Sequence, residues 1–245
     1  MKKVISLLLA TVLALSVFTA CGGNESGKTE RPSPYIGKSA AFVGDSITYG
    51  IGLETQSNQY WVQVKDALQF GATHGMGVSG SCVSTKSARG YERSPLALRY
   101  ESIPKVDMIF IFMGTNDFGG NVPMGKISDN SDISYYGAWN MILTKLKDKY
   151  PETKIILMTS VPRYSLTENK LGLKLDDYVA ALKEIAEHHE LPVMDLYTLT
   201  ADIFTEDAIE ELMPDKIHPN EEGHRLLAET VKKWLEDNQD TIFPE

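Results

Sequence analysis

The sequence predicts an α/β protein in which helices cover both faces of a central parallel sheet, forming a three-layer α/β/α sandwich. Short apolar runs typical of buried strands recur at residues 40–43, 106–113, 154–159 and 192–195. Segments with apolar residues at helical spacing lie between these runs, and polar, glycine-containing loops follow them. The alternating region covers about 200 residues, a length that suits a single domain.

The individual elements follow in chain order. A helix is predicted after the first strand, over about residues 60–68, with Gly71 as its end, and a weaker strand follows near 72–78. Further apolar stripes at helical spacing begin at Trp139, at Tyr178 and at Leu227. The last helix has Asn220 placed to cap its N-terminus. In such sheets ligands bind beyond the carboxyl ends of the strands, so the loops at that edge are where chemistry is expected.

The charge balance and the cysteine count exclude some classes of protein. The formal net charge is −9, and removal of Lys2 and Lys3 with an N-terminal signal would make it −11. An acidic surface disfavours nucleic acid as a partner. The two cysteines are Cys21 and Cys82, and lipidation of the first would leave no pair for an internal disulfide. No metal-binding spacing is present, so neither a metal nor another cofactor is expected, and no pattern indicates an oligomeric state.

The N-terminus has the layout of an export signal. Two lysines precede an apolar run over residues 4–20, and small residues follow. The segment Phe-Thr-Ala-Cys at 18–21 resembles the cleavage box of bacterial lipoproteins, with Phe18 in place of the usual leucine. The resemblance implies that residues 1–20 are removed and that Cys21 carries a lipid. The protein would then lie on the outer face of the cell membrane, or be periplasmic and attached to the outer membrane.

Residues 21–37 are predicted to form a flexible tether, and residues 38–245 a single domain. The stretch GGNESGKT at 22–29 satisfies the P-loop pattern G-x-x-x-x-G-K-[ST]. A P-loop needs a buried strand before it and a helix at its lysine, but here a processing site precedes and Pro32 and Pro34 follow. Nucleotide binding is therefore not expected.

Four short blocks lie in loops after predicted strands or before the last helix. They are Gly-Asp-Ser at 44–46, Gly-Val-Ser-Gly-Ser at 77–81, Gly-Thr-Asn-Asp at 114–117 and Asp-Lys-Ile-His-Pro at 215–219. In this combination and order they resemble the SGNH hydrolases, the GDSL esterase/lipase group, over nearly all of residues 38–237. The resemblance implies the flavodoxin-like SGNH hydrolase fold and a serine esterase without a cofactor.

The residue types in these blocks fit ester hydrolysis. A serine hydroxyl such as that of Ser46 needs a base to take its proton, and histidine side chains exchange protons near neutral pH. Of the five histidines, only His218 precedes the capped last helix with a carboxylate, Asp215, three residues earlier. The resemblance makes Ser46, His218 and Asp215 the catalytic residues. It also makes the backbone N–H groups of Ser46 and Gly80 and the side-chain amide of Asn116 the donors to the oxyanion.

Two further groups of residues receive predictions. Asp45 and Asp117 are expected to be structural acids that hold the loops. The loops at 81–104 and 118–134 are expected to shape the pocket. Their arginines would either bind an anionic substrate or lie in solvent, and solvation is the favoured interpretation. The first loop contributes Arg89, Tyr91, Arg93, Arg99 and Tyr100, and the second contributes Phe118, Gly119, Gly120, Asn121 and Met124.

The export signal, together with the absence of a long apolar loop, favours a small acyl group as the group removed. Such an enzyme would be an O-acetyl esterase that acts on an extracellular polysaccharide or a small ester. A lysophospholipase or short-chain lipase is the alternative enzyme. A glycan-binding surface lipoprotein that has lost catalysis is the alternative of another class, against which the complete set of blocks argues.

Overall fold

The computed structural model describes residues 32–88 and 94–244. Five parallel strands form one sheet in the order β2-β1-β3-β4-β5, with in-register neighbours such as Phe42 and Phe110 on β1 and β3. The strands are β1 Ala40–Gly44, β2 Thr73–Gly77, β3 Met108–Phe112, β4 Lys154–Met158 and β5 Val193–Met194. The predicted α/β fold with a parallel central sheet is therefore confirmed.

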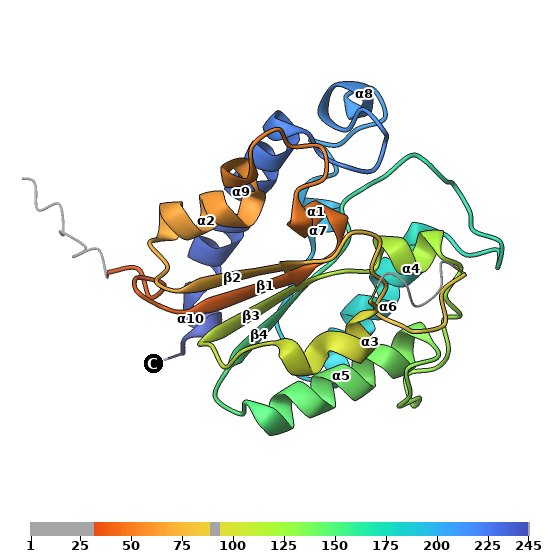
Figure 1. Cartoon of the computed structure of the whole chain (residues 1–245), viewed down its shortest axis with the longest axis horizontal. Coiled ribbons are helices and arrows are strands. Elements are labelled where there is room, and N and C mark those ends of the chain that lie inside the picture. The colour runs from red at the N-terminus through yellow and green to blue at the C-terminus, as the bar shows by residue number, and fades with distance from the viewer. Residues whose placement is uncertain (1–31, 89–93, 245) are drawn as a thin grey trace, which may run out of the picture. The chain divides into compact units, whose positions relative to one another are not determined.

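The described helices flank the sheet or lie at its edges (Figure 1). They are α1 Ser46–Tyr49, α2 Tyr60–Leu68, α3 Leu96–Arg99, α4 Thr115–Gly119, α5 Tyr135–Lys149, α6 Leu175–His188, α7 Leu196–Leu199, α8 Ile209–Leu212, α9 Glu221–Asp237 and α10 Gln239–Ile242, with 3₁₀ turns η1 Gln56–Asn58 and η3 Tyr100–Ser102. The Asn220 side chain caps α9 by accepting from the backbone N–H of Gly223 at 3.0 Å, as the sequence predicted.

The apolar core divides into two clusters, one on each face of the sheet, because successive strand residues point to opposite faces. Val43 and Ile111 belong to the cluster that packs against α3, α5 and α6. Phe42 and Phe110 belong to the cluster that packs against α2 and α9, and their rings stack with centroids 4.8 Å apart. Figure 1 shows the resulting three layers, with α2 and α9 on one side of the sheet and α5 on the other.

The folded unit begins before residue 38, where the sequence placed its start. Tyr35 is fully buried, its ring packs against Phe70, and its hydroxyl donates to the carbonyl oxygen of Leu235 at 2.7 Å. The predicted tether therefore extends too far, because residues 35–37 belong to the domain. The predictions for residues 1–31, including the signal, the lipidated Cys21 and the rejected P-loop, lie outside the described residues.

Candidate active site

Ser46 lies at the carboxyl end of β1, where the chain turns directly into α1. Asp45 caps this short helix, since its Oδ1 accepts from the backbone N–H of Ile47 at 3.0 Å. Ser46 is therefore the first residue of a capped helix at the rim of the sheet, and only 3% of its surface is exposed.

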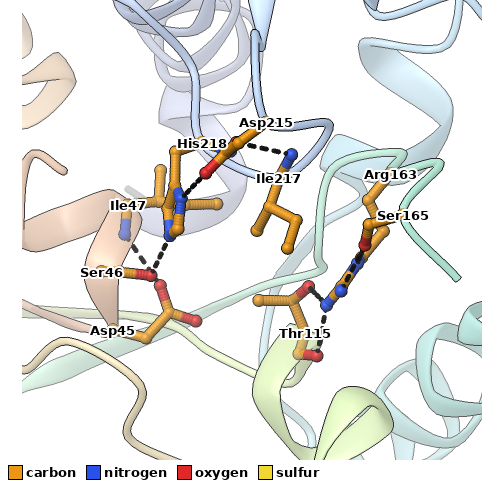
Figure 2. Close-up of polar contacts among 9 residues, drawn as sticks. All are labelled: Asp45, Ser46, Ile47, Thr115, Arg163, Ser165, Asp215, Ile217 and His218. Atoms are coloured by element: carbon orange, nitrogen blue, oxygen red, sulfur yellow. Dashed lines mark hydrogen bonds and ion pairs between the residues drawn. The ribbon is translucent and has the colours of Figure 1, made fainter. Parts of the chain in front are cut away.

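The structure brings together the three side chains that the sequence predicted to be catalytic. His218 Nε2 lies 2.8 Å from Ser46 Oγ, and His218 Nδ1 lies 2.5 Å from Asp215 Oδ2 (Figure 2). Because 172 positions separate the serine from the histidine, this contact depends on the whole fold and not on local sequence. The hydroxyl, the imidazole and the carboxylate form one hydrogen-bonded chain.

The Asp215 carboxylate also organises its own turn. Its Oδ1 accepts from the backbone N–H groups of Ile217 at 3.0 Å and His218 at 2.7 Å, while Oδ2 is bonded to the imidazole. Burial acts to raise the pKa of Asp215, but the hydrogen bonds from His218 and Ile217 outweigh it and leave the pKa lowered. The carboxylate is therefore ionised at neutral pH and available to stabilise an imidazolium.

The predicted oxyanion donors lie on neighbouring loops at the same edge of the sheet. Gly80 follows β2 with a φ of 74°, a conformation that favours glycine. Asn116 is the second residue of α4, which begins three residues after the end of β3, and its Nδ2 donates to Asp45 Oδ2 at 3.1 Å. The loops after the three adjacent strands β1, β2 and β3 thus carry Ser46, Gly80 and Asn116. Their role as oxyanion donors stays a prediction.

Asp45 and Asp117 hold the surrounding loops, as the sequence indicated. The carboxylate of Asp117 accepts from the backbone N–H of Val83 at 2.9 Å and of Ser84 at 3.2 Å, so it joins the loop after β2 to α4. Burial raises the pKa of Asp45 to about 6 and that of Asp117 to about 7. Both carboxyl groups are buried, so their charged forms are costly to the fold.

Arg99 does not lie in solvent, contrary to the favoured interpretation. Its guanidinium donates to the carbonyl oxygens of Gly44 at 2.8 Å, Met76 at 3.1 Å and Ser94 at 3.2 Å. Burial lowers the pKa of this side chain to about 10, although the nearby Asp45 acts to raise it. Arg99 thus holds the carboxyl ends of β1 and β2 together through these hydrogen bonds. The predicted pocket residues Arg89, Tyr91 and Arg93 lie outside the described residues.

Arg163 is a residue near the site that belongs to none of the four sequence blocks. It follows β4, and its Nη1 donates to the backbone oxygen and to the hydroxyl of Thr115, both at 3.0 Å (Figure 2). Its guanidinium also lies 5.5 Å from the centroid of the Phe118 ring. Since Thr115 directly precedes Asn116, Arg163 fixes the start of α4. The only sequence signal for it was its place in a loop after a strand.

The remaining histidines lie elsewhere. His74 is exposed on β2, and His189 is buried with its Nε2 2.8 Å from Asn140 Oδ1. His224 is fully buried in α9, where its Nδ1 accepts from the backbone N–H of Tyr60 at 3.2 Å. Burial and the charge of His218 lower the pKa of His224 to about 4, so the buried ring is neutral.

The neutral state of His224 predicts a pH-dependent contribution to stability. A pKa of 6.5 unfolded and about 4 folded means that the contribution is complete above pH 6.5 and lost as the pH falls to 4. It amounts to about 3 kcal/mol. The free energy of unfolding of the wild type relative to His224→Gln should shrink by that amount over this range in urea titrations. The difference between the two proteins cancels the contributions of Asp45 and Asp117 to the free energy of unfolding. The raised pKa values of these two carboxyl groups make stability change with pH in the opposite sense.

Away from this site, the described residues contain a cavity but no metal-ligand cluster and no membrane-spanning helix. A cavity of about 410 Å³, lined by residues that include Tyr150, Ile155 and Pro192, opens at the opposite end of β4 and beside the C-terminal segment. Within residues 32–88 and 94–244, no cluster of three or more metal-ligating side chains is found. Across the same ranges, no helix has the length and apolar character that crossing a membrane requires.

The fold and the site together define an α/β protein with the hydroxyl–imidazole–carboxylate arrangement of serine hydrolases. Comparison with known families gives the particular family. Residues 42–226 match the model of the GDSL-like Lipase/Acylhydrolase family. The chain therefore belongs to this family and is by class a carboxylic ester hydrolase, as the four sequence blocks predicted.

The individual proteins that resemble this chain have low sequence identity to it. An acetylxylan esterase from Xylanibacter ruminicola is 24% identical over an alignment of 205 residues. The match covers 78% of this chain and 42% of that protein, so the chain spans less than half of that relative. A structure of a Lactobacillus plantarum protein is 27% identical, covers 82% of this chain and 98% of its own, and has a TM-score of 0.74. An acetyl-xylooligosaccharide esterase from Geobacillus shares the fold at 22% identity, with 82% and 95% coverage and a TM-score of 0.60.

Proposed function

We propose that the protein is a serine esterase that removes small acyl groups, above all acetyl, from an extracellular carbohydrate through an acyl-enzyme. The observation that carries the mechanism is the hydrogen-bonded chain from Ser46 through His218 to Asp215. The carbohydrate substrate has support from the similarity to an acetylxylan esterase. Export and a lipid anchor at Cys21 belong to the same proposal and rest on the N-terminal sequence.

The proposed reaction follows from the positions of these groups. Ser46 Oγ attacks the ester carbonyl while His218 Nε2 takes its proton, and Asp215 stabilises the imidazolium that forms. The backbone N–H groups of Ser46 and Gly80 and the amide of Asn116 bind the tetrahedral oxyanion. His218 then donates its proton to the leaving alcohol. Water repeats the cycle on the acyl-serine and releases the acid.

Replacing Ser46 with alanine tests this function directly. The wild type is expected to release p-nitrophenol from p-nitrophenyl acetate, and the rate of Ser46→Ala is expected to fall by about 10⁶-fold, because no other group replaces the nucleophile. Equal rates from the two proteins would contradict the proposal, and equal rates at the level of the buffer alone would favour a binding protein. Circular dichroism of both proteins controls for folding.

The acyl group and the alcohol need separate measurements. Rates on p-nitrophenyl acetate, butyrate and octanoate distinguish an acetyl esterase, whose rate falls with chain length, from a lipase, whose rate rises. Acetate release from acetylated xylan, acetylated peptidoglycan and O-acetyl sialic acid then separates the carbohydrate classes. Release from none of the three would contradict the carbohydrate part of the proposal and leave the esterase part in place.

A further inference from the structure

Asp45 directly precedes the nucleophile Ser46 and accepts a hydrogen bond from the predicted oxyanion donor Asn116. It is 2% exposed, and its two carboxylate oxygens have different partners. Oδ1 accepts from the backbone N–H of Ile47 and caps α1, while Oδ2 accepts from Asn116 Nδ2 at 3.1 Å. The first bond is local in sequence, whereas the second joins the loop after β1 to the loop after β3, 71 positions away.

The second bond determines how the Asn116 amide is oriented. A carboxylate has only acceptors, so the amide turns its NH₂ group and not its carbonyl oxygen toward Asp45. An NH₂ group holds its two hydrogens in one plane at a fixed angle, so the direction of one N–H fixes the direction of the other. We propose that Asp45 is the positioning residue that makes Asn116 present an N–H, rather than its carbonyl oxygen, to the acyl oxygen. This inference rests on the proposed esterase function.

The electrostatics of the site support a functional reason for keeping a carboxylate here. Burial raises the pKa of Asp45 to about 6, so the fold is less stable with this carboxyl group charged than with it protonated. The Ile47 N–H, the charges of His218 and Arg99, and the Asn116 amide all favour the charged form but do not offset burial fully. A charged group that costs stability is expected where the charge orients other groups.

Asp45→Asn is the informative variant. The new side chain has the same shape, and its carbonyl oxygen can still accept from Ile47 and cap α1. Its NH₂ group would then face the NH₂ group of Asn116, and the two donors repel each other, so the Asn116 amide must rotate away. We expect kcat on p-nitrophenyl acetate to fall about 100-fold, the effect of losing one oxyanion donor, with little change in KM. The Tm is expected to change little, because removing the buried charge stabilises the fold while losing the hydrogen bond from Asn116 destabilises it.

A double-mutant cycle separates positioning from general damage. If Asp45 acts through Asn116, the double variant Asp45→Asn/Asn116→Ala should have the same kcat as Asn116→Ala alone. Asp117→Asn is the matched control, because it removes a neighbouring buried carboxylate whose bonds to Val83 and Ser84 an amide oxygen can still accept. Its kcat should fall far less than that of Asp45→Asn.

The outcomes distinguish the two proposals. Full kcat in Asp45→Asn, while Ser46→Ala is inactive, would overturn the inference and leave the esterase function standing. Full activity in Ser46→Ala would overturn the function itself. Additive losses in the double variant would show that Asp45 acts on kcat by a route other than Asn116 and would also overturn the inference.

Discussion

Replacing His218 with alanine is expected to lower kcat by about 10⁶-fold, as much as replacing Ser46, because the two side chains act as one unit. His218 Nε2 lies 2.8 Å from Ser46 Oγ and is the base placed to take the hydroxyl proton. Without the imidazole the hydroxyl keeps its proton and is a poor nucleophile at neutral pH. Single-turnover and steady-state rates on p-nitrophenyl acetate measure the loss.

The double variant Ser46→Ala/His218→Ala should be no slower than either single variant, because removing one member already disables the unit. His74→Ala serves as the control histidine. Its side chain is exposed on β2, and its kcat is expected to stay within about twofold of the wild type, as for most surface substitutions. A loss below 100-fold in His218→Ala would show that another group takes the proton and would rule out the proposed base.

The sheet and the position of the site were predictable because their signals are strong and local. Strand β3 and residues 155–158 of β4 are unbroken apolar runs buried on both faces, and short runs of this kind between polar loops are typical of the inner strands of a parallel sheet. The edge strand β2 gave a weaker signal, since His74 and Gly75 are exposed and only one side of the strand is paired. The residues that meet at the rim were predictable from the resemblance of four blocks and not from spacing alone.

The errors arose where one residue has two possible functions. Gly71 was expected to end α2, but the helix ends at Leu68, and Gln69 caps it in a left-handed conformation with φ 57°. Gly71 is needed for a close approach instead, since a Cβ there would lie 2.6 Å from the Gly37 oxygen. Sequence alone does not distinguish these two uses of glycine.

Long-range polar contacts were likewise beyond the sequence. Tyr35 lies among prolines and glycines, and its partner Leu235 is 200 positions away. Arg99 belongs to no polar motif in the sequence. Its hydrogen bonds to the ends of β1 and β2 are evident only from the folded structure. The bond between Asp45 and Asn116 belongs to the same class, because each residue alone is typical of a turn.

Gly77 positions the nucleophile through the absence of a side chain, and Gly77→Ala is expected to impair both stability and catalysis. A Cβ at this position on β2 would press on the backbone nitrogen of Tyr49 and lie 2.6 Å from the carbonyl carbon of Thr48. Both atoms belong to the backbone of α1, which carries Ser46 at its start. Backbone atoms of a packed helix cannot rotate away as a side chain can, so α1 itself must move.

The expected size of the effect follows from that movement. Overpacking of this kind lowers the free energy of unfolding by about 3 kcal/mol. A displacement of roughly 1 Å at Ser46 would lower kcat about 100-fold. Urea unfolding and rates on p-nitrophenyl acetate, measured on the same preparation, give both quantities. Unchanged stability and kcat would mean that β2 and α1 separate without disturbing the site, contrary to this reasoning.

Gly37→Ala provides the comparison that isolates the contact with α1. Gly37 has a φ of 73°, so an alanine there is strained and costs about 1–2 kcal/mol, but a Cβ would meet no atom within 4 Å. Gly37 precedes β1 and therefore lies at the end of the sheet opposite Ser46. We expect Gly37→Ala to lose stability but keep full kcat, whereas Gly77→Ala should lose both. This pair of results would show that the loss of catalysis comes from the displaced helix and not from reduced stability in general.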